Sequence, residues 1–426
     1  MARKILKNWL RFLARQVLKK YHPRMVVITG STGKTSTKEA VLMVLKKSNE
    51  DNRVIGTQGN LNTEFGVTAT IIQPGFTGTE SGRDVKLTIK DLGWLTWRAI
   101  ESLITKVNYP KVLVLELAAD RPNDIKYFMS FIRPEVSVLT NIGDVHLEFF
   151  GSKSELVEEK SLIIANLNPK GVAILNKEDD FSKLISHKTS AKKVLVSTEN
   201  EADIYARDIA FGGKGMHFTL INNNQVVQVD LPVFGYQFIY SALFAIAVGD
   251  YFGVAKNVAA QRLKGLILPK SRFEIIRLGN MAIIDDTYNA NPTSTVAALK
   301  SLARIGVNRK KTAILGDMRE LGSAHQKGHQ TVGECAARVV DQLYVVGDGG
   351  QLIKIAAIEA GLSRDQVCDF SDEAISLILQ DNGVVLVKGS KSVKMDKIVE
   401  LIKNKFYERS CEDSNRERES DSGNNY

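Results

Sequence analysis

A glycine-rich turn close to the start of the chain limits the folds it can adopt more than any other feature. The apolar run 25–29 predicts a short buried strand, and a helix is expected over residues 35–47. The loop that joins them consists of Gly30, Ser31, Thr32, Gly33, Lys34, Thr35 and Ser36. This order predicts a nucleoside triphosphate site, in which backbone N–H groups hold phosphates, Lys34 reaches the terminal oxygens and Thr35 binds Mg²⁺. The longer Walker pattern would have Gly or Ala at Ile28, so the loop is a Gly-x-x-Gly-Lys-Thr variant.

Strands that alternate with helices continue through the chain and predict an α/β fold. Further apolar runs occupy 111–117, 136–140, 171–175 and 193–196, which indicates a mostly parallel sheet of the P-loop ATPase type. Residues 203–232 alternate apolar and polar side chains, so we expect antiparallel hairpins at the edge of the same sheet. A second, Rossmann-like α/β series has its strands at 281–284, 312–315, 342–346 and 383–387.

At 426 residues the chain is long enough for two or three domains. We expect a basic amphipathic helix over 1–24, a nucleotide-binding domain over 25–270, a Rossmann-like domain over 271–406 and a disordered tail over 407–426. The tail is expected to be disordered because it has almost no apolar residue with which to build a core.

Positive charge is concentrated at the N-terminus. The formal net charge is +9, and residues 1–24 alone carry eight basic and no acidic residues, so a nucleic-acid partner for the nearly neutral remainder is not expected. Two interpretations of this helix stay open: it packs on the next domain, or it lies on an anionic membrane surface. The chain has no uncharged apolar run that could cross a membrane, and its three cysteines are widely spaced. We therefore expect a cytoplasmic protein, with membrane association through 1–24 left open.

Two polar side chains follow predicted strands of the first series. Glu116 comes at the end of the apolar strand residues 112–115, and His146 lies shortly after the strand at 136–140. The carboxyl ends of parallel strands face the ligand crevice of an open α/β sheet, so Glu116 is a candidate Mg²⁺ ligand and His146 is expected on the same rim.

Six motifs in order resemble the Mur ligase family, the ATP-dependent amide-forming enzymes of peptidoglycan precursor synthesis. They are ITGSTGKTS (28–36), GNLNTEFGV (59–67), TNIGDVHLEFFGS (140–152) with Lys160 eight residues further on, IDDTYNANP (284–292), LGDMRELG (315–322) and VKGSKSVKM (387–395). The resemblance covers about residues 25–405 and implies the fold described above.

The resemblance also implies roles for individual residues. Two Mg²⁺ ions would be held by Thr35, Glu116, His146 and Lys160, with Lys160 carbamylated by CO₂, and Lys34, Lys160 and His146 would be catalytic. ATP would be bound by the phosphate loop and by Asn289, Arg272 and Asp317. Asn60, Asn62 and Thr63 would belong to an acceptor-side substrate loop.

The implied reaction joins a carboxylate to an amine. The carboxylate takes the γ-phosphoryl group of ATP to become an acyl phosphate, which the amine then attacks. Within the family the motifs most resemble the member that adds D-alanyl-D-alanine to a UDP-linked muramoyl tripeptide.

The family usually carries a further N-terminal domain that binds UDP, whereas 24 residues precede the first predicted strand here. Three substrate alternatives stay open: residues 1–24 and 75–110 substitute for it, a partner supplies the surface, or the substrate is lipid-linked or lacks UDP. A non-catalytic, ATP-binding, membrane-associated partner protein is the alternative from another class.

Overall fold

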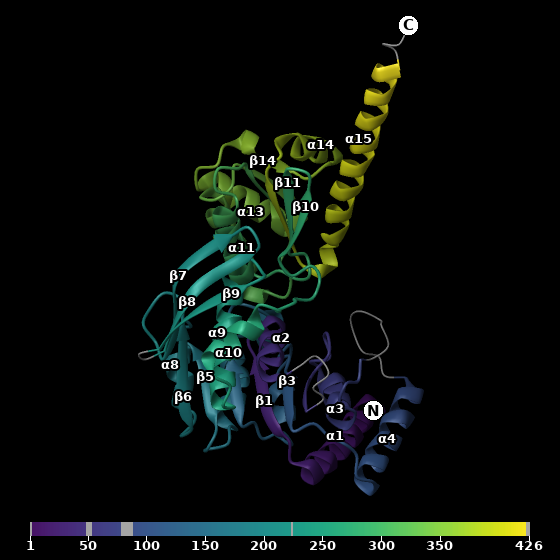
Figure 1. Ribbon diagram of the computed structural model, residues 1–426, viewed down its shortest axis with the longest axis vertical. Coiled ribbons are helices and arrows are strands. Elements are labelled where there is room, and N and C mark those ends of the chain that lie inside the picture. The colour runs from purple at the N-terminus through teal and green to yellow at the C-terminus, as the bar shows by residue number, and fades with distance from the viewer. Residues whose placement is uncertain (1, 48–52, 78–87, 223–224, 423–426) are drawn as a thin grey trace. The chain divides into compact units, whose positions relative to one another are not determined.

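The computed structural model describes residues 2–47, 53–77, 88–222 and 225–422 (Figure 1). The chain forms two compact units, each with its own sheet. The first consists of Met1–Val233 with Gln237–Leu268, and the second of Phe234–Tyr236 with Pro269–Tyr426.

The first unit is built on a nine-stranded sheet with the order β2-β3-β1-β4-β5-β6-β7-β8-β9. The strands from β2 to β7 are parallel, and β8 and β9 are antiparallel additions, which confirms the mostly parallel sheet and the hairpins expected over 203–232. Their bounds are β1 Arg24–Thr29, β2 Val54–Gly56, β3 Val112–Glu116, β4 Val136–Leu139, β5 Val172–Asn176, β6 Lys192–Ser197, β7 Ile204–Gly212, β8 Gly215–Asn222 and β9 Gln225–Leu231.

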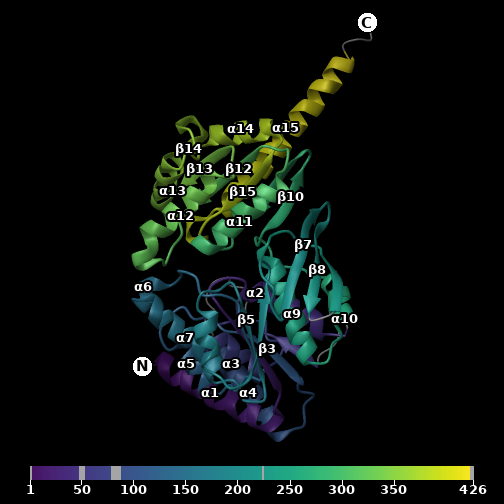
Figure 2. The ribbon, with the colours of Figure 1, turned by 90° about the vertical axis from the view of Figure 1, so that its left-hand side faces the viewer.

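Helices cover both faces of the parallel part of this sheet. In one layer α2, α9 and α10 pack on one another, and α3, α5, α7 and α8 form the other layer, with the short α6 packed on α7 and with α1 and α4 outside α3 (Figures 1 and 2). Every residue of β3, β4 and β5 is buried, as expected for strands covered on two sides. The bounds are α1 Ala2–Tyr21, α2 Lys34–Leu45, α3 Glu64–Ile72, α4 Ile89–Ile104, α5 Asp124–Met129, α6 Leu147–Phe150, α7 Lys153–Ala165, α8 Ser182–Ser186, α9 Gln237–Tyr251 and α10 Lys256–Leu263.

The amphipathic N-terminal helix packs on its own unit. Leu10, Leu13 and Val17 of α1 are buried, and the helix contacts α3 and α4. No helix among the described residues is long and apolar enough to cross a bilayer.

The register around β1 determines what lies at the carboxyl edge of the sheet. β1 pairs in parallel with β3 on one side and β4 on the other, with Ile28 opposite Glu116 and Thr29 opposite Leu139. Three strands therefore end side by side, and the residues that follow them meet at one place.

The second unit contains a six-stranded sheet with the order β10-β11-β15-β12-β13-β14, parallel except for β10 (Figure 2). This confirms the second α/β series. Residues of α14 and α15 share a buried core with one face of the sheet, and α12 packs on both α11 and α13. The strands are β10 Glu274–Leu278, β11 Met281–Asp285, β12 Lys311–Gly316, β13 Gln342–Val346, β14 Val367–Asp369 and β15 Val384–Lys388, and the helices are α11 Pro292–Ile305, α12 His325–Ala337, α13 Asp348–Glu359, α14 Asp372–Asp381 and α15 Asp396–Ser422.

The polar tail differs from expectation. We expected disorder from residue 407, but α15 runs without a break from Asp396 to Ser422. Its first turns are held by Ile398, Val399 and Ile402 in the core. The charged continuation contains many Glu and Arg residues, which have high helix propensity, so a helix that starts on the core can extend into this polar segment.

Candidate active site

The phosphate loop joins β1 to α2 with a backbone that requires glycine. A Cβ atom on Gly30 would lie 1.9 Å from the Thr140 hydroxyl oxygen, so a side chain does not fit there. Gly33 precedes α2 with a left-handed φ of 76°, a conformation that costs glycine little. The loop thus brings the N-terminus of α2 to the edge of the sheet, where its backbone N–H groups can bind a phosphate group.

The segment after β4 holds this loop in shape. The backbone N–H of Thr32 donates to Asn141 Oδ1 at 2.9 Å, and the N–H of Ser31 donates to the Asn141 carbonyl at 2.9 Å. The N–H of Gly143 donates to the Ser31 hydroxyl at 2.9 Å. The motif that begins at Thr140 is therefore a support for the phosphate loop as well as the route to His146.

Glu116 lies at the end of β3, directly beside the loop. Its Oε1 accepts hydrogen bonds from the Thr35 hydroxyl and from Asn62 Nδ2, both at 3.0 Å. The residue is 1% exposed, and among the described residues its Oε2 has no hydrogen-bond donor. A buried carboxylate oxygen of this kind is costly unless a cation is bound to it.

This arrangement fits Mg²⁺. No group of three or more His, Cys, Asp or Glu side chains in the described part of the chain is placed to hold a metal ion. Mg²⁺ does not need such a cage at a nucleotide, because it usually takes one or two protein oxygens together with phosphate oxygens and water. The Thr35 hydroxyl and the Glu116 carboxylate supply that number.

A buried lysine that the sequence did not single out supports the same carboxylate. Lys38 of α2 is fully buried, and its Nζ donates to the Thr57 carbonyl at 2.7 Å and lies 2.9 Å from Glu39 Oε1. It also lies 4.0 Å from Glu116 Oε2. Its position four residues after Lys34, on the same side of the helix, is the only signal in the sequence that places it near the site.

Lys160 of α7 reaches the phosphate loop from the opposite side. It is fully buried, and its Nζ donates to the Gly30 carbonyl at 3.2 Å. Burial, and then the charge of the nearby Lys34, lower the pKa of Lys160 to about 7, against the opposing effects of Asp120 and Glu159. A large share of Lys160 is therefore an uncharged amine near neutral pH.

His146 and Lys160 share a neighbour that the sequence analysis missed. His146 Nε2 lies 3.3 Å from Asp120 Oδ1, and the charge of Asp120 acts to raise the pKa of Lys160. His146 has a left-handed φ of 58° at the start of α6. Asp120 follows β3, four residues beyond Glu116, so the strand-end rule that selected Glu116 extends to it.

The substrate-loop residues lie at different places. Asn62 contacts Glu116, and its carbonyl accepts from the N–H of Ala118 at 2.9 Å. Thr63 directly precedes α3 and has an extended backbone, and Asn60 is exposed. Of the three, Asn62 is the residue that the structure brings to the carboxylate.

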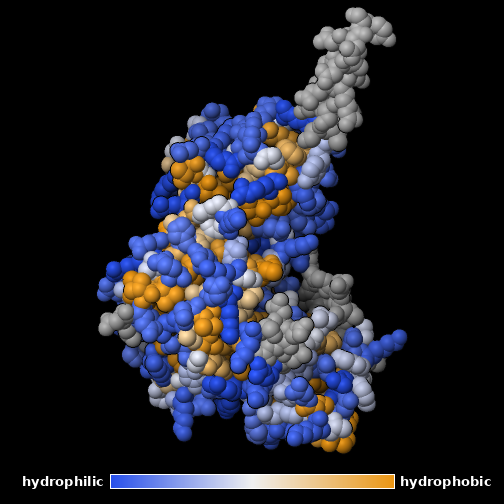
Figure 3. All heavy atoms as spheres, viewed as in Figure 1, coloured by the Kyte–Doolittle hydropathy of each residue, from blue (hydrophilic) through white to orange (hydrophobic). Residues whose placement is uncertain are grey.

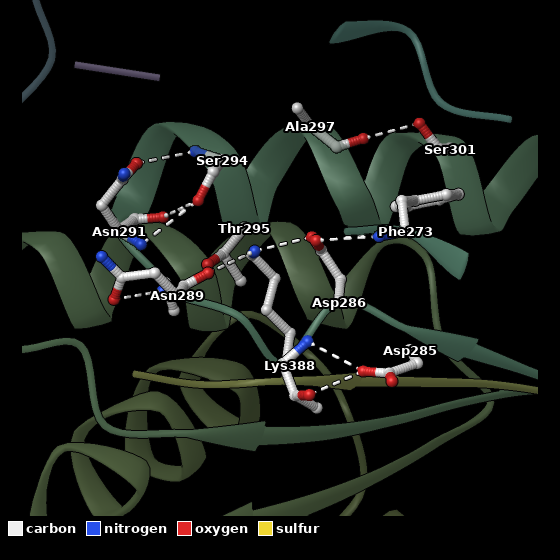
Figure 4. A network of polar contacts seen from close by, with 12 residues as sticks. Phe273, Asp285, Asp286, Asn289, Asn291, Ser294, Thr295, Ala297, Ser301 and Lys388 are labelled. Atoms are coloured by element: carbon white, nitrogen blue, oxygen red, sulfur yellow. Dashed lines mark hydrogen bonds and ion pairs between the residues drawn. The ribbon is translucent and has the colours of Figure 1, made fainter. Parts of the chain in front are cut away.

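In the second unit, the segment after β11 is held by a buried lysine (Figure 4). Lys388 Nζ lies 2.6 Å from Asp286 Oδ2 and donates to the Asn289 carbonyl at 2.9 Å. The Asn289 side chain is exposed, and its Oδ1 accepts a hydrogen bond from the N–H of Ala290 at 2.9 Å.

Arg272 and Asp317 have different surroundings. The Arg272 guanidinium stacks over the Tyr288 ring at 3.8 Å, and its buried Nε has no acceptor among the described residues. Asp317 is 3% exposed, and its Oδ1 accepts the N–H of Gly349 at 2.5 Å, near the start of α13. Its Oδ2 lies 2.7 Å from the exposed Arg319. Asp317 thus fixes a helix start and an arginine of its own unit.

Two family models match the chain: the Mur ligase middle domain over residues 99–249, and the Mur ligase, glutamate ligase domain over 271–391. The UDP-N-acetylmuramoyl-tripeptide–D-alanyl-D-alanine ligase of Haemophilus influenzae is 30% identical over 92% of this chain and 80% of that protein. The enzyme of the same name from Bacillus subtilis is 28% identical over 92% and 78%. Among solved structures, MurF ligase from Thermotoga maritima in complex with ADP has a TM-score of 0.76 at 25% identity, with 95% of this chain and 84% of that one covered.

The chain has a P-loop sheet domain followed by a Rossmann-like domain, and the two family models match in the same order. This arrangement is that of the ATP-dependent ligases that form amide bonds. The chain belongs to the Mur ligase family.

Replacing Glu116 tests the metal assignment. In Glu116→Gln the carboxylate charge is lost while Thr35 and the loop remain. The Mg²⁺ concentration that half-saturates binding of a non-hydrolysable ATP analogue should rise about ten- to hundredfold. Calorimetric titration measures this, with Glu148→Gln, an exposed carboxylate of α6, as the control. An unchanged Mg²⁺ requirement in Glu116→Gln would remove Glu116 from the metal site.

The burial of Lys160 predicts a pH-dependent stability. Its pKa is about 7 in the folded chain and near the ordinary 10.5 when unfolded. Below pH 7 the lysine is charged in both states, so the cost of its burial is fully present. Between 7 and 10.5 only the unfolded state holds the proton, so folded-state stability rises with pH. The thermal midpoint of Lys160→Met should therefore exceed that of the parent by several degrees at pH 6 and by much less at pH 9, in CO₂-free buffer.

The control for this comparison is Lys153→Met, a partly exposed lysine of the same helix. A difference between Lys160→Met and the parent that does not change with pH would contradict the assigned pKa.

Proposed function

We propose that this chain joins D-alanyl-D-alanine to a UDP-linked muramoyl tripeptide at the expense of ATP. The support from the comparisons is that the similarity to the enzymes of that name extends over about nine-tenths of the chain, well beyond the nucleotide site. The support from the geometry is a single observation: Glu116 and Lys160 both contact the phosphate loop, Glu116 at the Thr35 hydroxyl and Lys160 at the Gly30 carbonyl. The product is a peptidoglycan precursor, and we propose the cytoplasm as the place of the reaction because the chain requires ATP and a UDP-linked donor there.

The first step brings negative groups together. The tripeptide carboxylate attacks the γ-phosphorus of ATP, and ADP leaves, giving an acyl phosphate. The loop N–H groups, Lys34 and the N-terminus of α2 bind the phosphates and offset the charge that develops on their oxygens. Thr35 and Glu116 would hold Mg²⁺, which when bound would supply further charge neutralisation.

The second step forms the amide bond. The amine of D-alanyl-D-alanine attacks the acyl carbonyl carbon, inorganic phosphate leaves, and the amine loses its proton. Asn62, which donates to Glu116, would position a substrate group, and the remaining loop residues Asn60 and Thr63 would complete the acceptor side.

We further propose that CO₂ adds to Lys160 to give a carbamate. Only the uncharged amine reacts with CO₂, and the lowered pKa of Lys160 keeps a large share of it uncharged at pH 7. The reaction releases a proton and turns the uncharged amine into an anion, whereas the ammonium form would repel cations. This anion would provide a second Mg²⁺ position at the loop. His146, which contacts Asp120, would contribute to the same position.

In the second unit, we propose that Asn289 and Arg272 contact the nucleotide. Two observations support this: Arg272 Nε has no acceptor in the part of the chain that the structure describes, and the Asn289 side chain is exposed. Asp317 would contribute through Arg319, which it holds. The functional domains would then be 25–270 and 271–406.

The test is product formation by the purified full chain. With ATP, Mg²⁺, bicarbonate, the UDP-linked tripeptide and D-alanyl-D-alanine, intact mass should show the joined product together with equimolar ADP, and omission of either substrate should abolish ADP release. Lys160→Met should lower turnover at least 100-fold, whereas Lys153→Met should retain it. ADP release without a product of the expected mass, or product from a lipid-linked or UDP-free donor alone, would refute the substrate assignment.

A further inference from the structure

Large apolar side chains are exposed together on α1 and α4. On α1 they recur at three- and four-residue spacing, and on α4 they form a second row along the helix. We call this surface the aromatic face: Ile5, Trp9, Phe12, Trp94, Trp97, Ile100 and Ile104, each between 41% and 78% exposed. Figure 3 shows apolar side chains at the surface in the lower right part, where Figure 1 places these helices.

The two rows form one surface because the helices are fixed to each other. Trp9 Nε1 donates to the Thr96 hydroxyl at 3.1 Å, in the middle of the exposed rows. At the other end, Lys20 Nζ donates to the Ser102 carbonyl at 2.8 Å, and the Tyr21 hydroxyl donates to the same oxygen at 2.6 Å. The helices also pack on α3 through their opposite sides, so the aromatic face is presented on a supported layer.

The exposed apolar area of the aromatic face is larger than that of single apolar residues scattered over a surface. About half of each of seven large side chains, with roughly 150–250 Å² for an aromatic one, amounts to on the order of 600 Å² of apolar surface. The largest apolar patch of a typical monomer is about 300–600 Å² and is often functional, so the aromatic face lies at the upper end of that range.

Charge beside the aromatic face has one sign. The exposed side of α1 also carries Lys4, Arg15 and Lys19, and α1 contains no acidic residue. The two acids of α4 are engaged locally, since Asp91 caps the helix with Thr88 and Glu101 pairs with Arg98. The surface is therefore apolar in the middle and basic along one side.

We propose that the aromatic face is a docking surface for a lipid bilayer that contains anionic headgroups, on which α1 and α4 lie flat. Tryptophan is favoured at the boundary between headgroups and acyl chains, and lysine and arginine bind the lipid phosphates. A protein partner fits less well, because lysine is depleted from protein–protein interfaces. The proposal is independent of the substrate assignment and extends the N-terminal helix to a two-helix surface.

The tryptophans provide a direct probe. The chain has three, Trp9, Trp94 and Trp97, and all lie in the aromatic face. Adding vesicles of phosphatidylcholine with about one-third phosphatidylglycerol to the full chain should shift tryptophan emission to the blue and carry the protein into the vesicle fraction on flotation. Pure phosphatidylcholine vesicles should bind at least tenfold less.

Two double variants separate the apolar and the charged contributions. Trp97→Ser with Ile104→Ser should weaken partitioning at least tenfold at any salt concentration, while Trp9 and Trp94 still report. Arg15→Gln with Lys19→Gln should weaken it about tenfold at low salt and progressively less as salt screens the charges. The control, Ile355→Ser with Leu377→Ser, removes apolar side chains that are 53% and 55% exposed in the second unit and should bind as the parent does.

Three outcomes would overturn the proposal. These are equal binding to neutral and anionic vesicles, no emission shift with either, or self-association that is abolished by Trp97→Ser with Ile104→Ser, which would assign the face to a second copy of the chain. Light scattering at the concentrations of the vesicle assay detects the last of these. Retained ligase turnover in vesicle-free buffer confirms that a variant with weakened binding is folded.

Discussion

The parallel pairing of β1 with β3 and β4 is the constraint on which the site depends. Because the three strands run side by side in one direction, whatever follows them is delivered to the same edge of the sheet. The phosphate loop follows β1, Glu116 ends β3, and the segment that supports the loop follows β4. No long-range arrangement of loops is needed to bring these groups together, since their separation is set by the strand spacing.

Burial then determines the chemistry of the groups at this edge. α7 packs against β1 and β4, which places Lys160 under the Gly30 carbonyl without access to water. The loss of hydration weakens its charged form, so a residue that would be cationic on a surface is partly a neutral amine here. Glu116 is also buried, and among the described residues its Oε2 accepts no hydrogen bond, which makes this carboxylate a candidate ligand for a cation. The same exclusion of solvent thus produces a candidate cation ligand and a partly uncharged amine.

The sequence predicted those parts of the structure that follow from local rules. The loop between a strand and a helix, the strand ends that select Glu116, and the change from parallel strands to hairpins were all readable and are confirmed in the fold. The three-residue strands β2 and β14 were missed because they are too short for a periodic pattern. Lys160 was identified by resemblance alone, since nothing in the run Glu158, Glu159, Lys160 indicates burial. Lys38 was missed because its proximity to Glu116 depends on how α2, which follows β1, packs beside the end of β3. Asp120 was missed because its proximity to His146 depends on how the segment after β3 folds back.

The most direct test of this account is whether Lys160 takes up CO₂. Carbon-13 NMR of the full chain, equilibrated at pH 8 with carbon-13 bicarbonate and Mg²⁺, should show a slowly exchanging carbamate resonance that persists in Lys153→Met and disappears in Lys160→Met. A spectrum without such a resonance, or one that is the same in the parent and in Lys160→Met, would contradict the claim that the buried amine at the phosphate loop becomes an anion.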